Sequence, residues 1–96
     1  MNRLDLLTTA RAEYRDATSW YRDQNPAVAA RFVTEVEAAL DSIQRHPSQH
    51  LRWDDRYRFC LLRGFPYYVP YRIEGDAIFV VAVFHTSRDS SAWTSR

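Results

Sequence analysis

The spacing of apolar residues changes once along this chain, and that change limits most strongly the folds it can adopt. Between residues 8 and 45, apolar side chains recur every three or four positions, as on one face of a helix. After residue 56 they alternate or run continuously, as in β-strands. A chain of 96 residues has room for one hydrophobic core. We therefore predict that residues 1–96 form a single α+β domain, with helices packed against a sheet.

The helical part is predicted to form two antiparallel helices. A first apolar stripe consists of Ala10, Tyr14, Ala17 and Tyr21, and a second consists of Val28, Phe32, Val36, Ala39 or Leu40, and Ile43. Thr8 or Thr9 is the expected N-cap of the first helix. Asn25 is the expected cap of the second helix and Pro26 its first residue, because proline needs no hydrogen bond there. His46-Pro47 should end it, since the residue before proline avoids the helical region.

The second part of the chain is predicted to form a mostly antiparallel sheet. The strands are expected at residues 57–63, 67–73 and 77–84, with a short extra strand near residues 3–7. Because residues 77–84 are continuously apolar, we expect a central strand covered on both faces. Pro70 lacks an N–H for the ladder, so the second strand should be an edge there or be bulged.

Composition narrows the classes of function. The lone Cys60 lies in an apolar run and is expected to be a buried, inert thiol. The three histidines show no metal-ligand spacing, and no phosphate loop appears, so no metal or cofactor is implied. Arg3 and Asp5 interrupt any signal peptide, and the longest apolar run is too short for a membrane span. We therefore expect a cytoplasmic protein without a membrane partner.

Several short strings follow one another in a characteristic order along nearly the whole chain. They are Ala12-Glu13, Trp20-Tyr21, Ala29-Ala30, Glu35-Val36, His46-Pro47, Phe65-Pro66-Tyr67, Tyr71-Arg72-Ile73 and Ala82-Val83-Phe84-His85, followed by Arg88 and Trp93. Together with the order of elements, they resemble the RelE/ParE toxin superfamily. The resemblance implies a β-α-α-β-β-β domain that acts as the toxin of a type II toxin–antitoxin module. It also implies a cognate antitoxin as the stable partner.

The resemblance leaves three functions open. RelE-like members cut messenger RNA on the ribosome, whereas ParE-like members inhibit DNA gyrase and are not known for hydrolysis. A degenerate member would bind its antitoxin without being toxic.

Cleavage of RNA by its 2′-hydroxyl needs a proton-transfer group, cations beside the phosphorane and aromatic rings that hold the bases. The candidate catalytic residues are His85 as general acid or base, with Arg58, Arg63 and Arg88 as charge stabilisers; the candidate base-stacking residues are Tyr68 and Trp93. The role of Arg88 is carried over from the RelE-like nucleases. All thirteen cations are arginine, which binds phosphate with a planar fork.

The sequence also departs from the nuclease pattern. Where RelE-like enzymes have two alternating lysines, it has Arg58 and Cys60. Where they tend to have a tyrosine near the C-terminus, it has Trp93, which has no acidic hydroxyl. Strand alternation places Arg58 on one face and Arg63 on the other, unless the strand twists near Gly64. Our working expectation is that the sheet face away from the helices displays the arginines and the imidazole.

Overall fold

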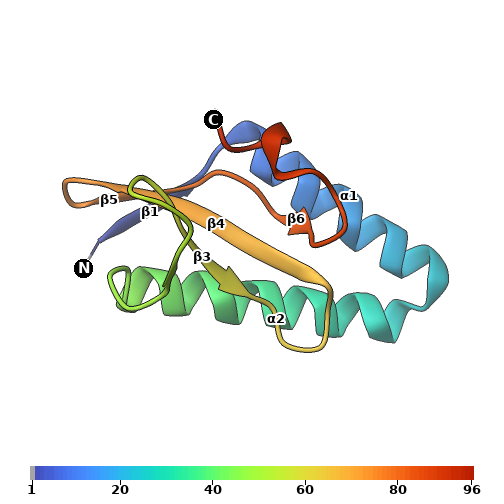
Figure 1. Ribbon diagram of the computed structural model, residues 1–96. Coiled ribbons are helices and arrows are strands. Elements are labelled where there is room, and N and C mark those ends of the chain that lie inside the picture. Colours follow the sequence, from blue (N-terminus) through green and yellow to red (C-terminus); the bar gives the residue numbers. More distant parts are fainter. Residues whose placement is uncertain (1) are drawn as a thin grey trace.

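The computed structural model describes residues 2–96 and contains two long helices on one face of a sheet (Figure 1). The helices are α1 (Thr8–Gln24) and α2 (Pro26–Arg45), and a 3-10 turn, η1, spans Ser90–Ala92. The strands are β1 (Arg3–Leu6), β2 (Leu51–Arg52), β3 (Arg58–Leu61), β4 (Tyr67–Glu74), β5 (Ala77–Val80) and β6 (Phe84–His85). The predicted α+β class and the helix pair packed on the sheet are confirmed.

The junction between the helices was predicted correctly, but the start of α1 was not. The Asn25 side chain accepts a hydrogen bond of 2.9 Å from the backbone N–H of Ala27, and Pro26 is the first residue of α2. Leu7 occupies the N-cap position of α1, and its side chain cannot cap. The predicted threonine cap is therefore wrong, because the turn that leaves β1 places both threonines inside the helix.

The sheet has the strand order β1-β5-β4-β3-β2, and β6 pairs with β4 beyond the end of β5. Within residues 2–96, β1 and β5 pair in parallel, and the other strand pairs are antiparallel. The strand predicted at residues 77–84 is interrupted, since β5 ends at Val80 and β6 begins at Phe84. The strand with partners on both sides along most of its length is β4, the central strand of the sheet.

Pro70 lies inside this central strand, so the prediction of an edge there is wrong. The alternative prediction was a bulge in this strand, but the register places the extra residue in the segment opposite it. Tyr68 pairs with Phe84 and Tyr71 with Val80, so two residues of β4 face residues 81–83. The Pro70 carbonyl accepts from the N–H of Val81 at 3.0 Å. The N–H and C=O of one residue point to the same side of a strand. The side on which Pro70 lacks an N–H therefore faces residues 81–83, where the neighbouring strand is interrupted.

Both faces of the sheet are covered. The helix-facing core includes Phe32, Val36, Val69, Tyr71 and Val80. A second cluster on the opposite face consists of Tyr57, Tyr68, Val81, Ala82, Phe84 and Trp93. The segment after β6 folds back over that face and supplies Trp93 (Figure 1).

Candidate functional site

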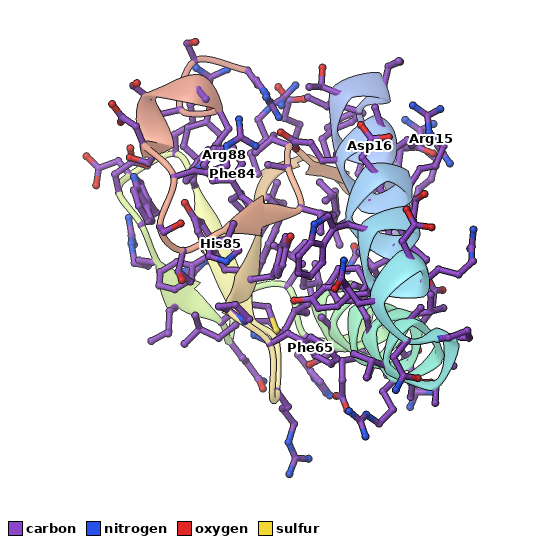
Figure 2. The ribbon with its side chains drawn as sticks, turned by 90° about the vertical axis from the view of Figure 1, so that its right-hand side faces the viewer. Arg15, Asp16, Phe65, Phe84, His85 and Arg88 are labelled. Carbon is purple, nitrogen blue, oxygen red and sulfur yellow. The ribbon has the colours of Figure 1, made fainter. Side chains whose placement is uncertain are left out.

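His85 and Arg88 are the two predicted catalytic residues that the fold brings together. They line one hollow of about 280 Å³, between α1 and the end of β6, together with Glu13 and Trp20. Figure 2 shows both on the strand side of the molecule, facing α1. The guanidinium of Arg88 lies 4.2 Å from the centre of the Phe84 ring, and one of its nitrogens lies 3.8 Å from the Glu13 carboxylate.

The hydrogen bonds of His85 fix which ring nitrogen carries the proton. Its Nδ1 accepts from the backbone N–H of Ser87 at 3.0 Å and lies 2.8 Å from the Ser87 hydroxyl. A neutral ring in this position carries its hydrogen on Nε2. Because Nδ1 accepts from Ser87, the neutral ring presents Nε2–H as a hydrogen-bond donor to the hollow's surroundings.

Arg58 and Arg63 do not join this pair. Arg58 shares the helix-facing side of β3 with Cys60, as alternation predicted, and donates to the backbone carbonyl of His50 at 2.8 Å. Arg63 lies in the loop beyond β3 and lines a separate hollow beside Tyr21. The expectation that one sheet face displays all the arginines and the imidazole is therefore wrong. The cause is that β3 ends at Leu61, before Arg63, while the pleat turns Arg58 inward.

The two predicted base-stacking residues are buried in the second core. Trp93 is 0% exposed and Tyr68 is 6% exposed. The indole N–H of Trp93 donates to the Tyr68 hydroxyl at 2.8 Å, and the Trp53 ring lies 4.9 Å from that of Trp93. In this arrangement neither ring offers a face to a nucleobase. Alternation placed Tyr68 on the correct face, but it did not reveal that the C-terminal segment covers that face.

Cys60 is half-buried on the helix-facing side of β3. Burial raises the pKa of its thiol, which disfavours the reactive thiolate. Among residues 2–96, no group of three or more His, Cys, Asp or Glu side chains is placed to hold a metal ion. No helix in the same range is long and apolar enough to cross a bilayer.

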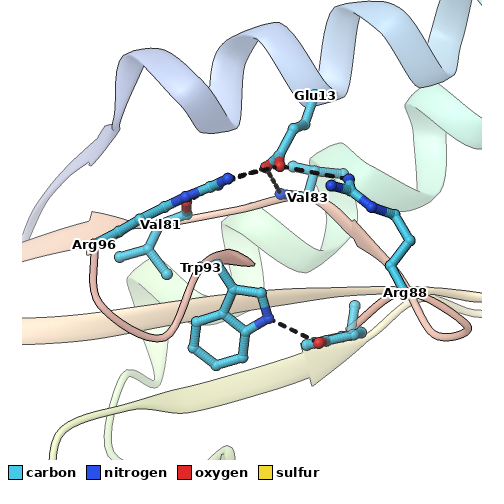
Figure 3. Close-up of polar contacts among 7 residues, drawn as sticks. Glu13, Val81, Val83, Arg88, Trp93 and Arg96 are labelled. Atoms are coloured by element: carbon cyan, nitrogen blue, oxygen red, sulfur yellow. Dashed lines mark hydrogen bonds and ion pairs between the residues drawn. The ribbon is translucent and has the colours of Figure 1, made fainter. Parts of the chain in front are cut away.

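Glu13 is the residue of this region that the sequence analysis missed. Its carboxylate accepts two hydrogen bonds from the Arg96 guanidinium, at 2.9 and 3.1 Å, and one from the backbone N–H of Val83 at 3.2 Å (Figure 3). Val83 lies in the interruption between β5 and β6, so this side chain replaces a lost ladder partner. The available signal was a carboxylate on the apolar stripe, three residues after Ala10 and four before Ala17.

A helix pair laid on this mixed sheet is the fold of the RelE/ParE superfamily of toxins. The family model described as "ParE toxin of type II toxin-antitoxin system, parDE" matches residues 4–90, and the chain belongs to this family. A solved chain described as "Chromosomal ParDE TA system from P. aeruginosa" has the same fold, with a TM-score of 0.78. The two are 19% identical, and the alignment covers 91% of this chain and 98% of that one. No curated protein sequence gives a significant match.

Proposed function

We propose that this protein is a toxin that a cognate antitoxin neutralises, and that it inhibits DNA gyrase by binding it rather than by cutting RNA. The observation that supports a non-hydrolytic mode is the state of the candidate nuclease residues. Nδ1 of His85 accepts a hydrogen bond from the backbone N–H of Ser87, and the rings of Tyr68 and Trp93 are buried. Arg58 points away from the hollow that contains Arg88 and donates to a backbone carbonyl. A nuclease needs these groups free and convergent on one phosphate.

Membership of the ParE family supports the same choice, since the resemblance to ParE-like toxins implies inhibition of gyrase rather than hydrolysis. In this proposal the arginines and aromatic rings of the sheet stabilise the fold. Target binding would then depend on exposed surface.

We propose that the antitoxin covers an apolar rim on the sheet face away from the helices. Leu51 pairs with Phe59 across β2 and β3, so their side chains share one face, and Leu61 follows on the same side of β3. The exposed fractions are 57% for Leu51, 55% for Leu61 and 40% for Trp53, which packs edge-on against Phe59. Exposed apolar side chains gathered in this way mark a partner surface.

Induced expression with and without the antitoxin, combined with pulse-labelling of DNA and protein synthesis, tests the proposal. Gyrase inhibition predicts that DNA synthesis stops first, while protein synthesis continues. If protein synthesis stopped first, the result would instead indicate that the toxin cleaves messenger RNA. Unimpaired growth despite stable antitoxin binding would indicate a member that has lost its toxicity.

A further inference from the structure

A third hollow lies at the opposite end of β3 from the apolar residue Leu61. The pairing of β3 with β4 begins at Arg58 and Tyr71, whereas β4 continues to Glu74. The loop that leads into β3 closes the space beside this free stretch of β4 and leaves a hollow of about 160 Å³. That volume is below the roughly 300–1,000 Å³ typical of sites for drug-sized ligands, so the hollow suits a small group.

Arginine dominates the lining of this hollow. Four of its lining residues are arginines: Arg52, Arg56, Arg58 and Arg72. The two carboxylates of the lining belong to Asp54 and Asp55. Because the whole chain carries a net charge of only +1, this excess of cations is a local feature.

The two carboxylates are engaged elsewhere. Asp54 accepts from the backbone N–H groups of Arg56 and Tyr57, each at 2.8 Å, and so shapes the loop. Asp55 forms an exposed ion pair with Arg52 at 3.3 Å. Arg56 packs over the ring of Tyr57, at 5.3 Å from its centre. These contacts hold the loop in place and occupy both carboxylates of the lining.

Arg72 supplies an observation that is independent of the lining. Its Nε is buried and has no hydrogen-bond partner among the described residues. The Glu74 carboxylate lies 3.6 Å away, which is too long for a hydrogen bond. The guanidinium lies over the Phe79 ring, 5.1 Å from its centre, and its Nη1 donates to the Arg96 carbonyl at 3.4 Å. A buried N–H on a charged group without an acceptor is costly, so the Arg72 guanidinium, which belongs to a residue of the lining, has unused donor capacity.

We propose that this hollow binds a phosphate group, with Arg72 and Arg56 as principal donors. Guanidinium forks match the oxygens of a tetrahedral oxyanion and donate charge-assisted hydrogen bonds to it. The site is separate from the hollow that His85 and Arg88 line, and it does not depend on which process the toxin blocks.

Titration with inorganic phosphate, followed by NMR of the arginine Nε–H groups, tests this site. The Nε–H resonance of Arg72 should shift and saturate, while sodium chloride at the same ionic strength leaves it in place. Arg56→Ala, at an exposed rim position, should weaken phosphate binding about tenfold, the loss of one charge-assisted contact. Arg15→Ala is the matched control, because Arg15 is also exposed and lies beside an aspartate, but on α1. It should change the affinity less than about twofold.

Two arms distinguish the source of the phosphate. A short DNA duplex that displaces inorganic phosphate and shifts Arg72 would assign the site to a nucleic-acid backbone. Phosphate binding without DNA binding would assign it to a small phosphorylated ligand. The proposal is overturned if Arg72 shows no phosphate-specific shift, or if Arg15→Ala weakens binding as much as Arg56→Ala.

Discussion

Replacing Glu13 by alanine should destabilise this protein more than any other single change to an ion pair. The carboxylate and its partner guanidinium of Arg96 are only 13% and 18% exposed. The same carboxylate also holds the N–H of Val83, in the interruption between two strands. Arg96 donates in turn to the carbonyl of Val81 at 3.0 Å, so its orientation depends on both contacts.

The expected loss follows from these contacts. Hydrogen bonds to charged groups contribute roughly 1.5–3 kcal/mol each, and removing one partner of a buried pair costs roughly 3–5 kcal/mol. Because this pair is partly hydrated, we expect Glu13→Ala to lower the free energy of unfolding by about 3 kcal/mol. For a domain of this size, that corresponds to a fall in melting temperature of roughly 12–24 °C.

The loss in the free energy of unfolding is measured by urea denaturation of Glu13→Ala, Arg96→Ala and the double variant. The double-mutant cycle should give a coupling energy of about 1–2 kcal/mol. The control is Asp41→Ala, which removes an exposed pair with Arg45 and should cost about 0.5 kcal/mol or less. A Glu13→Ala protein as stable as the Asp41→Ala protein, or a coupling energy near zero, would refute the reasoning.

Three further perturbations follow from the fold. Trp93→Ala should lower the free energy of unfolding by about 3–5 kcal/mol, because the ring is fully buried. Trp20→Ala, at a ring that is 58% exposed, should lower it by less than about 1 kcal/mol, and thermal melts of the two variants make the comparison. Burial raises the pKa of Tyr71 from 10.0 to about 12, so the folded state binds its phenol proton more tightly than the unfolded state. Its contribution to stability is complete below pH 10, falls as the pH rises toward 12, and should be absent from Tyr71→Phe when denaturation is followed against pH. Asn25→Ala removes the N-cap of α2 and should lower the free energy of unfolding by about 1 kcal/mol, measured by thermal melts.

Most of the fold could be predicted from periodicity, because each helix buries a single stripe and the strand alternation matches the pleat. Tyr68 and Tyr71 were placed on the correct faces, and the junction at Asn25 and Pro26 was correct in detail. The third predicted strand was the main failure in the sheet. The continuous apolar run at residues 77–84 correctly indicates burial on both faces of the sheet. It does not indicate that residues 81–83 lie outside the strands and interrupt the hydrogen-bonded ladder.

The site was harder to predict, since it depends on contacts between distant parts of the chain. Trp93 was expected to be available to bases, yet it fills the second core through residues far from it in sequence. Glu13 meets Val83 and Arg96 only because the segment after β6 folds back toward α1. No local pattern encodes a contact of this kind.

The central claim, that this toxin blocks gyrase without cutting RNA, is tested most directly with purified components. DNA gyrase should lose its supercoiling activity as the toxin is added and recover when the antitoxin is supplied in excess. In a cell-free translation reaction, the same toxin should leave the messenger RNA intact. Cleaved message together with normal supercoiling at excess toxin would contradict the account.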